Sequence, residues 1–429
     1  MVMRINVHDY SGHPFQVDLS RELARRGHEV VHQFATQYVT GRGRLAVTVD
    51  DPPTLRIEGL AARRPLRKYE PWARAHFEVS YARAWRRHLR AEPYDLVVAC
   101  NVPLFALAAM RRHFRRAGQP WVLWHQDVYS LGVAAEAHRR LPAPASHLVE
   151  QRLQRIEARQ VRDAHAVVAI GTGFVDQYRR WDVDTRSVHV IPNWAPLTDI
   201  VPGPRDNAWS REVGLPEAPL RLLYAGTLGR KHNPLLLLEL LDAVRRRNVD
   251  VVLTVVSEGV GADDLRAAAG GRSDVRILPY QPAERLGDVL ASADVMLALL
   301  EPDAARFSVP SKILSYLAAG RPAVALVPDA NPCATDVRDS GGWVSPPTNW
   351  GVASAADWLR DHSDPAQLAA LGRRARALAE ERFGVDVIGD RFEAVFRSVV
   401  DGSPPVPARQ RRAVVTPDLR DVAAQPESV

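Results

Sequence analysis

Short apolar runs alternate with segments of helical periodicity along most of the chain, and this alternation constrains the fold more than any other feature. In the first half, strands are predicted at residues 4–8, 29–33, 96–100, 121–124 and 166–170, and helices at 15–26, 104–114 and 147–163. In the second half, strands are predicted at residues 221–225, 251–256, 275–278, 293–299 and 323–326, and helices at 234–246 and 312–319. Strands joined through helices form parallel sheets that carry helices on both faces. The pattern therefore predicts an α/β protein with two doubly wound, Rossmann-like domains.

The length of 429 residues suits two or more domains. We expect an N-terminal domain over residues 1–190 and a second domain over residues 191–385. A return helix over residues 386–402 is expected to end the fold. Residues 403–429 lack periodicity and are rich in Pro, Arg and Ser, which predicts a disordered tail. The proline-rich, polar segment at residues 196–219 is expected to connect the two domains.

Composition disfavours several classes of protein. No N-terminal stretch looks like a signal peptide, and no apolar run is long enough to span a bilayer. The two cysteines, Cys100 and Cys333, lie far apart, which argues against a disulfide framework. No cluster of His, Cys and Asp has the spacing of metal ligands, so no metal is expected. We therefore expect a soluble, cytoplasmic protein.

Basic residues are concentrated between Arg63 and Arg116, where 13 of them accompany only four acidic residues. Within this stretch Phe77, Tyr81 and Trp85 recur at helical spacing, which predicts an amphipathic helix. Its arginines could rest on the anionic inner face of the plasma membrane or hold an anionic acceptor. Alternatively, the aromatic stripe packs on its own domain and the arginines are only solvated. No recognition motif accompanies the charge, so nucleic acid is not an expected partner.

Only three of the 56 basic residues are lysines, namely Lys68, Lys231 and Lys312. Lys231 ends a glycine-containing turn, and Lys312 begins an apolar helix. A compact ammonium beside glycines or a helix start is a common way to hold phosphate. The sequence therefore predicts a site for a nucleoside-diphosphate compound. The alternative is that both are surface lysines in ordinary turns.

The glycine-containing turn lies between a predicted strand and a predicted helix. It reads Gly226-Thr227-Leu228-Gly229-Arg230-Lys231. Glycines allow a backbone to approach a ligand closely, and the two cations can neutralise a diphosphate. The spacing differs from that of a Walker phosphate loop. The start of the chain also lacks the Gly-x-Gly-x-x-Gly pattern of a dinucleotide-binding dehydrogenase.

The second segment with a lysine reads Ser308-Val309-Pro310-Ser311 and precedes a helix that begins at Lys312. The free N–H groups and the dipole of a helix start favour an anion, and the lysine adds its charge. This pattern predicts a second contact with the phosphates. An ordinary capped helix is the alternative.

The string from Val309 to Pro322 resembles the donor-binding region of family 4 glycosyltransferases. Further similar segments follow in the family's order, at Gly12 with residues 23–30 and at residues 191–194, 224–231 and 278–281. The resemblance extends up to about residue 400. It is strongest to the branch that makes bacterial surface polysaccharides, such as the colanic-acid and O-antigen N-acetylfucosamine transferases. It implies the GT-B fold, in which two Rossmann-like domains face each other across a cleft.

The resemblance implies roles for residues on the donor side. Arg230 and Lys231 would hold the donor pyrophosphate as catalytic cations, and Tyr280 and Gln281 would lie near the nucleobase. The full set of implied donor-binding residues is Gly226, Thr227, Gly229, Glu258, Tyr280, Gln281, Ser308, Val309, Pro310, Ser311, Lys312 and Ser315.

The resemblance also implies roles for residues of the N-terminal half. Gly12, His13 and Asn101 would face the donor phosphates or the acceptor. His125 and Asp127 would act beside the reacting sugar, as catalytic residues. For His125 an alternative is open, in which it is an ordinary hydrogen-bonded residue at the end of a strand.

The chain departs from the family at one pair of positions. Many members carry two glutamates eight positions apart, and these positions are Phe307 and Ser315 here. Glu301 and Asp303 lie upstream in the same loop and are candidates to contact the sugar instead. Loss of the second glutamate would change ribose recognition or mark weak activity.

The function implied by the resemblance is retaining transfer of a sugar from a nucleoside-diphosphate sugar to an acceptor hydroxyl. The acceptor would be a lipid-linked or cell-surface glycan precursor. Fixed cations would stabilise the charge that grows on the departing diphosphate, without a bound metal. Two alternatives stay open: a nucleotide-sugar 2-epimerase, and a non-catalytic, degenerate transferase that acts as a partner subunit. The nucleotide base, the sugar, the linkage and the oligomeric state are left open.

Overall fold

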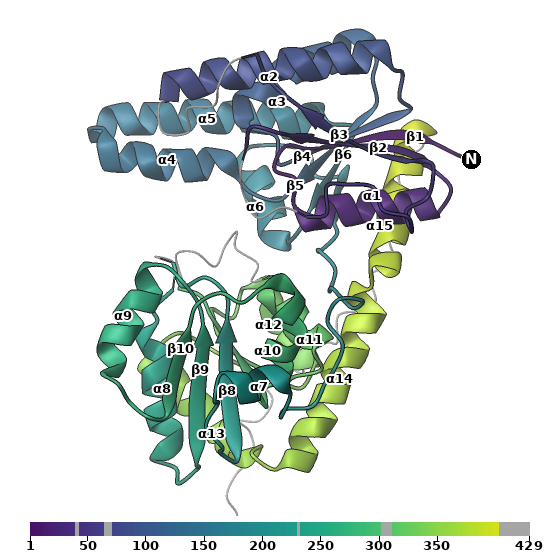
Figure 1. Ribbon diagram of the computed structural model, residues 1–429. Helices are drawn as coiled ribbons and strands as arrows, with labels where there is room; N and C mark the ends of the chain where they lie inside the picture. The colour runs from purple at the N-terminus through teal and green to yellow at the C-terminus, as the bar shows by residue number, and fades with distance from the viewer. Residues whose placement is uncertain (39–42, 64–70, 230–231, 302–310, 403–429) are drawn as a thin grey trace, which may run out of the picture.

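The chain forms two parallel β-sheets, each covered by helices (Figure 1). The computed structural model describes residues 1–38, 43–63, 71–229, 232–301 and 311–402. The predicted α/β class with two doubly wound sheets is therefore confirmed. We refer to each sheet with its covering helices as the N-terminal body and the C-terminal body.

The N-terminal body contains a seven-stranded sheet in the order β3-β2-β1-β4-β5-β6-β7. Its strands are β1 (Arg4–Asp9), β2 (Glu29–Ala35), β3 (Leu55–Leu60), β4 (Leu96–Cys100), β5 (Trp121–His125), β6 (Ala166–Ala169) and β7 (Val188–Val190). Its helices are α1 (Pro14–Arg25), α2 (Pro71–Ala91), α3 (Leu104–Ala117), α4 (Tyr129–Arg140), α5 (Ala143–Asp163) and α6 (Thr172–Arg180). The strand order reverses between β1 and β4, which is where open α/β sheets bind ligands.

The C-terminal body contains a six-stranded sheet in the order β10-β9-β8-β11-β12-β13. Its strands are β8 (Leu220–Ala225), β9 (Val251–Val256), β10 (Val275–Leu278), β11 (Val295–Leu299), β12 (Ala323–Leu326) and β13 (Trp343–Ser345). Its helices are α7 (Ala208–Glu212), α8 (Leu235–Arg245), α9 (Val260–Ala269), η1 (Ala283–Arg285), α10 (Leu286–Ala291), α11 (Lys312–Ala318), α12 (Pro332–Asp339), α13 (Asn349–Asp361) and α14 (Pro365–Phe383). Here the order reverses between β8 and β11, so this sheet also has a switch point.

The aromatic stripe of α2 faces the interior of the N-terminal body. Phe77, Tyr81 and Trp85 have no exposed surface, and Trp85 stacks on His8 with ring centroids 3.7 Å apart. The stripe therefore packs on its own body, as in the second of the two interpretations above. The exposed arginines of this helix are Arg83, Arg86, Arg87 and Arg90. None of the helices in the described part of the chain is long and apolar enough to cross a membrane.

The last helix of the fold returns to the first sheet. Helix α14 packs on the C-terminal body, and α15 (Val385–Val400) packs beside α1 on the N-terminal body (Figure 1). Ile388, Phe392 and Phe396 are buried there, and the ring centroids of Phe392 and Trp124 lie 4.7 Å apart. Together α1 and α15 cover one face of this sheet, while α2, α3 and α5 cover the other.

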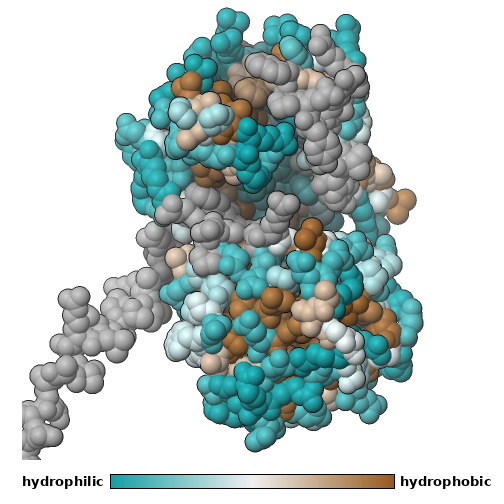
Figure 2. Space-filling model, turned by 90° about the vertical axis from the view of Figure 1, so that its left-hand side faces the viewer, coloured by the Kyte–Doolittle hydropathy of each residue, from teal (hydrophilic) through white to brown (hydrophobic). Residues whose placement is uncertain are grey.

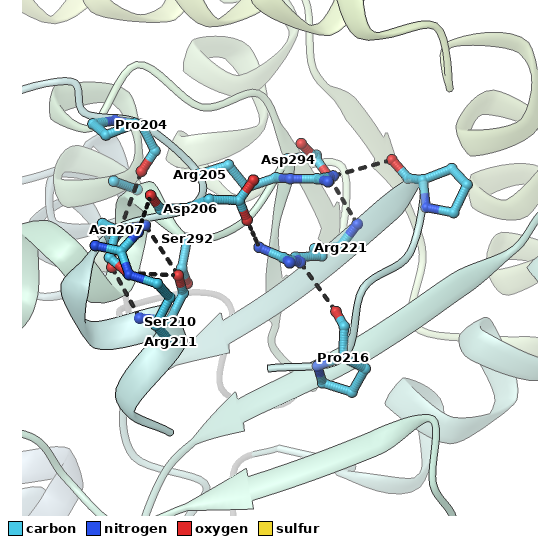
Figure 3. Close-up of polar contacts among 12 residues, drawn as sticks. Pro204, Arg205, Asp206, Asn207, Ser210, Arg211, Pro216, Arg221, Ser292 and Asp294 are labelled. Atoms are coloured by element: carbon cyan, nitrogen blue, oxygen red, sulfur yellow. Dashed lines mark hydrogen bonds and ion pairs between the residues drawn. The ribbon is translucent and has the colours of Figure 1, made fainter. Parts of the chain in front are cut away.

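The segment at residues 196–219 is more than a connection, which differs from the expectation. It contains α7, whose Trp209 is 1% exposed and belongs to the core of the C-terminal body. Figure 3 shows how charged groups bind the segment to the second sheet. Arg205 pairs with Asp294 at 2.9 Å, and Asp206 pairs with Arg221 at 2.8 Å. The proline-rich composition concealed this short helix because its apolar pattern rests on one tryptophan.

Helix α5 begins four residues before its predicted start. Pro144 lies in its first turn, where proline is tolerated because its missing N–H has no partner in the helix. Helix α4, which precedes it, was not predicted. The predicted tail at residues 403–429 lies outside the described residues.

Candidate active site

A cavity of about 480 Å³ lies between the two bodies. Its walls come from the start of α1, from the segment that follows β7, and from the carboxyl end of the second sheet. The lining residues are Pro14, Phe15, Asp18, Trp194, Pro196, Asp199, Gly226, Thr227, His232, Leu299, Leu300, Ser311, Lys312, Leu314 and Ser315. Figure 2 shows that the surface is hollowed between the N-terminal body and the C-terminal body. Ligands of open α/β sheets bind at this end of the strands.

The structure brings several of the predicted donor residues together in this cavity. They come from two segments that are far apart in sequence, the turn after β8 and the start of α11. The predicted residues that line the cavity are Gly226, Thr227, Ser311, Lys312 and Ser315. Helix α11 has only seven residues, so its dipole is small, and the Lys312 ammonium adds a full positive charge at its start.

Lys312 is held by Tyr224, a residue that the sequence analysis did not single out. Its Nζ donates a hydrogen bond of 2.5 Å to the Tyr224 hydroxyl, and it lies 3.8 Å from the centre of the tyrosine ring. The hydroxyl in turn donates to the carbonyl of Thr227 at 3.0 Å. A lysine and the turn after β8 are thus joined through one buried phenol.

Gly226 fits closely beneath the same ammonium. It has φ of 131°, a conformation that favours glycine. A Cβ at this position would lie 3.2 Å from the Nζ of Lys312. The Gly226 N–H donates to the carbonyl of Val256 at 3.0 Å, so the role of this glycine is to leave room for the lysine.

Two further N–H groups of the turn are also engaged. The N–H of Leu228 donates to Ser257 Oγ at 3.0 Å, and that of Gly229 donates to His232 Nδ1 at 3.1 Å. The turn is therefore fastened to the loop after β9 and to the segment before α8. The N–H groups of Gly226, Leu228 and Gly229 therefore already have partners within the protein.

Tyr280 and Glu258, two further predicted donor residues, lie next to this turn. The hydroxyl of Tyr280 is 2.6 Å from Thr227 Oγ1. The backbone N–H of Tyr280 donates to the Glu258 carboxylate at 3.2 Å. Tyr280 is 44% exposed, so its ring is accessible to a flat ligand. Glu258 thus positions the loop that carries this ring.

Gln281 is absent from the residues that line the cavity, and its predicted place near the nucleobase stays a prediction. Its Oε1 accepts a hydrogen bond of 2.9 Å from the indole of Trp209, and its Nε2 donates to the carbonyl of Pro279 at 3.0 Å. The side chain therefore links the loop after β10 to α7. It supports the Tyr280 loop from behind.

Several predicted site residues lie outside the described residues. These are Arg230, Lys231, Phe307, Ser308, Val309 and Pro310, together with Asp303.

The predicted acceptor-side residues gather around Asp9, at the end of β1. The Asp9 carboxylate accepts hydrogen bonds from the N–H of Ser11 at 3.1 Å, from the N–H of His13 at 2.6 Å and from the Asn101 amide at 2.9 Å. Burial raises the pKa of Asp9 to about 7, although these donors oppose the shift. Gly12, with φ of 73°, completes the turn. The loop leads directly into Pro14 and Phe15 of the cavity wall.

His125 lies inside the N-terminal body and does not line the cavity. It is 4% exposed. Its Nε2 lies 3.2 Å from the Glu157 carboxylate, and its Nδ1 lies 2.6 Å from the Tyr178 hydroxyl. Glu157 also accepts the N–H groups of Tyr129 and Ser130 at the start of α4. These contacts favour the alternative of a hydrogen-bonded residue at a strand end.

Asp127 is exposed in the loop between β5 and α4 and is absent from the residues that line the cavity. Its neighbour Gln126 exchanges hydrogen bonds with Asn193, at 2.9 Å and 3.2 Å. This pair joins the end of the fifth strand to the segment that enters the C-terminal body. The structure therefore leaves the predicted catalytic role of Asp127 as a prediction.

The cavity also contains two carboxylates that the sequence analysis missed, Asp18 and Asp199. Burial raises the pKa of Asp18 to about 6, Arg21 opposes this shift, and Asp199 adds to it. Asp18 comes from the first turns of α1, and Asp199 from the segment after β7. No local motif marks them, because only the approach of the two bodies places them opposite Lys312.

Two other observations bear on the site. Among the described residues, no group of three or more His, Cys, Asp or Glu side chains could hold a metal ion. A second, open hollow of about 580 Å³ lies at the other end of the C-terminal body, lined by charged residues of α8 and the segment before β10. There Arg272 pairs with Asp242 and Asp274, so both aspartates of the hollow already have a cationic partner.

Two protein families match separate parts of the chain. Residues 13–194 match the family described as a glycosyl transferase 4-like domain. Residues 219–361 match the family described as glycosyl transferases group 1. The two ranges include every residue that lines the cavity, except those of the segment between them.

Two individual proteins with similar sequences are also named as glycosyltransferases. WbjE of Pseudomonas aeruginosa, named as a glycosyltransferase, is 24% identical over 319 residues, which cover 73% of this chain and 77% of WbjE. WcaI of Escherichia coli K12, named as a glycosyl transferase of colanic acid biosynthesis, is 24% identical over 239 residues, which cover 54% of this chain and 56% of WcaI.

A solved structure shows the shared fold. The crystal structure of Anabaena HepE in complex with UDP and glucose superposes with a TM-score of 0.64 at 16% identity, over 92% of this chain and 100% of that one. Both halves of the chain thus match glycosyltransferase families in sequence, and 92% of the chain shares its fold with HepE. The chain belongs to the family 4 glycosyltransferases and has their GT-B fold.

Proposed function

We propose that the cavity binds a nucleoside-diphosphate sugar and that the chain transfers this sugar, with retention, to a hydroxyl of a lipid-linked or cell-surface glycan precursor. The observation that carries the proposal is the Lys312 ammonium, which lies over Gly226 at the carboxyl end of the second sheet. Family membership supports the retaining chemistry and the nucleotide-sugar donor.

The chemistry of the step explains why a fixed cation matters. The bond between the anomeric carbon and the diphosphate oxygen breaks, and negative charge grows on the departing group. An ammonium that is already in place stabilises this charge without reorganising. Arg230 and Lys231 are proposed to add to it. Closure of the two bodies around the donor would exclude water and limit its hydrolysis.

The relatives suggest which compounds to test first. HepE was crystallised with UDP and glucose, so UDP-sugars are the first candidates for the donor. WbjE and WcaI are named as glycosyltransferases, the second of colanic acid biosynthesis. A surface-polysaccharide precursor is therefore the acceptor class that we propose.

Thermal denaturation in the presence of nucleoside diphosphates and nucleotide sugars tests the proposal. A ligand that binds the native state raises the melting temperature. We expect one nucleotide sugar to stabilise the protein and Lys312→Ala to abolish the shift. Arg246→Ala, which removes an exposed cation outside the cavity, should leave the shift unchanged. Stabilisation by none of the compounds would contradict the proposed donor site.

Product analysis then separates the three activities that the fold permits. Transfer to an added acceptor supports the proposal. Isomerisation of the free nucleotide sugar would instead identify a 2-epimerase. Binding without turnover would identify a degenerate, non-catalytic subunit, for which Ser315 in place of a glutamate is the sequence feature to examine.

We further propose that the N-terminal body rests on the anionic inner face of the plasma membrane, where a lipid-linked acceptor would be located. The stretch from Arg63 to Arg116 supports this, through the exposed arginines of α2 and, on α3, Arg112, Arg115 and Arg116. Because the aromatic stripe of α2 is buried, the proposed contact is electrostatic and weakens as salt increases.

A further inference from the structure

Tyr224 occupies an unusual place between the sheet and the cavity. It is the next-to-last residue of β8 and has no exposed surface. Tyrosine is common in protein cores. Here, however, the hydroxyl contacts the Lys312 ammonium of the cavity wall and the Thr227 carbonyl in the turn after β8. Packing alone would be satisfied by phenylalanine.

The direction of each hydrogen bond at this hydroxyl follows from its partners. The Lys312 ammonium can only donate, so the Tyr224 oxygen accepts at 2.5 Å. The carbonyl of Thr227 can only accept, so it receives the phenol proton at 3.0 Å. Burial raises the pKa of Tyr224 well above its ordinary value, which keeps that proton in place. The hydroxyl therefore has one arrangement that satisfies both partners.

The ring of Tyr224 restrains the same ammonium from below. Nζ lies 3.8 Å from the ring centre, within the range in which the negative face of an aromatic ring attracts a cation. A lysine side chain has a flexible four-carbon stem, so a contact with its ammonium narrows the range of positions that Nζ samples. Gly226 leaves the space above the turn that this position of Nζ requires.

We propose that Tyr224 is a positioning residue for the donor diphosphate, holding the Lys312 ammonium over Gly226 through its hydroxyl and its ring. This inference rests on the proposed function, because it assumes that a nucleoside diphosphate occupies the cavity. It differs from a structural role in one respect. Loss of the hydroxyl weakens binding of the phosphates but leaves binding of the nucleoside unchanged.

A double-mutant cycle tests this inference. Dissociation constants for UDP and uridine are measured by calorimetry for the wild type, Tyr224→Phe, Lys312→Met and the double variant. We expect Tyr224→Phe to weaken UDP binding about tenfold, as for loss of a hydrogen bond to a charged group, with uridine binding unchanged. In the Lys312→Met background, Tyr224→Phe should add no further loss. Tyr316→Phe is the matched control, because its buried hydroxyl bonds only to backbone groups among the contacts identified.

The outcomes separate the inference from the proposed function. Equal weakening of UDP and uridine, or the same weakening in the Lys312→Met background, would overturn the positioning role of Tyr224. If the wild type binds UDP poorly, GDP, ADP, CDP and dTDP with their nucleosides replace it as probes. Failure of the wild type to bind any of these diphosphates would overturn the proposed donor site itself.

A spectroscopic measurement tests the geometry without altering Tyr224. The chain has only three lysines, so protein labelled with ¹³C-lysine has three Cε signals, and Lys312→Met identifies one of them. When a lysine ammonium lies above an aromatic ring, the protons of the adjacent Cε methylene resonate upfield of their usual position. We expect such a shift for Lys312 in the wild type. An unshifted Lys312 signal would overturn the inference even if Tyr224→Phe failed to fold.

Discussion

The amide of Asn101 donates a hydrogen bond of 2.9 Å to the carboxylate of Asp9, and so joins the ends of two neighbouring strands. Asn101 has φ of 53°, a left-handed conformation that asparagine tolerates better than most residues. Asp9 also receives the N–H groups of Ser11 and His13. The loop that the sequence assigned to the acceptor side is therefore organised by a buried acid that was not predicted.

Asp9→Asn should change how stability depends on pH. The pKa of Asp9 in the folded protein is about 7, above the ordinary 3.8. Between these values the folded protein binds more protons than the unfolded chain, so this group makes stability fall as pH rises, by up to about 1.4 kcal/mol per pH unit. The free energy of unfolding in urea, taken as wild type minus variant, should therefore decrease between about pH 4 and pH 7. Parallel stability curves would contradict the raised pKa.

His125→Gln should lower stability more than it lowers the turnover of the folded enzyme. The substitution leaves Glu157 and Tyr178 without their buried partner, which costs on the order of 1–3 kcal/mol. Glu157→Gln should have a similar effect, and the double variant should fall short of the sum because the two residues share one network. Loss of transfer at unchanged melting temperature would instead restore His125 to catalysis.

Gly226→Ala should weaken nucleotide binding and destabilise the fold by about 1–3 kcal/mol. An alanine there would be strained at φ of 131°, and its Cβ would lie 3.2 Å from the Lys312 ammonium. Gly287→Ala is the control, since a Cβ there meets only one atom within 4 Å, at 3.8 Å. Calorimetry with UDP measures the difference. Unchanged affinity in Gly226→Ala would show that Lys312 can move without loss.

Asp294→Asn should destabilise the C-terminal body by about 2 kcal/mol. Asp294 accepts from the Arg221 N–H at 2.8 Å and pairs with Arg205 (Figure 3). Its loss leaves a guanidinium of a largely buried network without its charge partner. Asp361→Asn removes an exposed ion pair with Arg360 and should leave the stability almost unchanged. Equal midpoints of urea unfolding for the two variants would contradict the importance of this network.

Charge reversal of Arg83, Arg86 and Arg87 to Glu should reduce binding to vesicles that contain anionic lipid, because each arginine contributes about 1 kcal/mol near such a surface. The matched control reverses three exposed arginines of the C-terminal body, Arg211, Arg246 and Arg373. It makes the same change in net charge and should bind as the wild type does. Flotation at low and high salt measures both, and equal binding by the two variants would remove the membrane proposal.

The central strands could be predicted from the sequence almost to the residue. Predicted and observed bounds agree for β4, β9 and β10, because these are short apolar runs between clear turns. Strand β3 was missed because it lies at the edge of the sheet and only its first residue, Leu55, is buried. Its composition resembles that of a loop.

The site was predictable only where its residues lie in one segment. Gly226 and Lys312 were found because each lies in a recognisable turn. The contact of Lys312 with Tyr224 joins residues 88 positions apart, and Asp18 reaches the cavity only when the two bodies come together. The orientation of His125 depends on Glu157 and Tyr178, which follow it by 32 and 53 positions. Nothing near His125 in the sequence reveals that it turns inward.

Helix α15 has a consequence for the order in which the protein is made. Ile388, Phe392 and Phe396 cover the face of the first sheet around Trp124, and Arg397 donates to the carbonyl of Met1 at 3.2 Å. A ribosome therefore completes the N-terminal strands nearly two hundred residues before it releases the helix that covers them. The C-terminal body can fold as it emerges. Part of the apolar face of the N-terminal body therefore stays uncovered until α15 has been made.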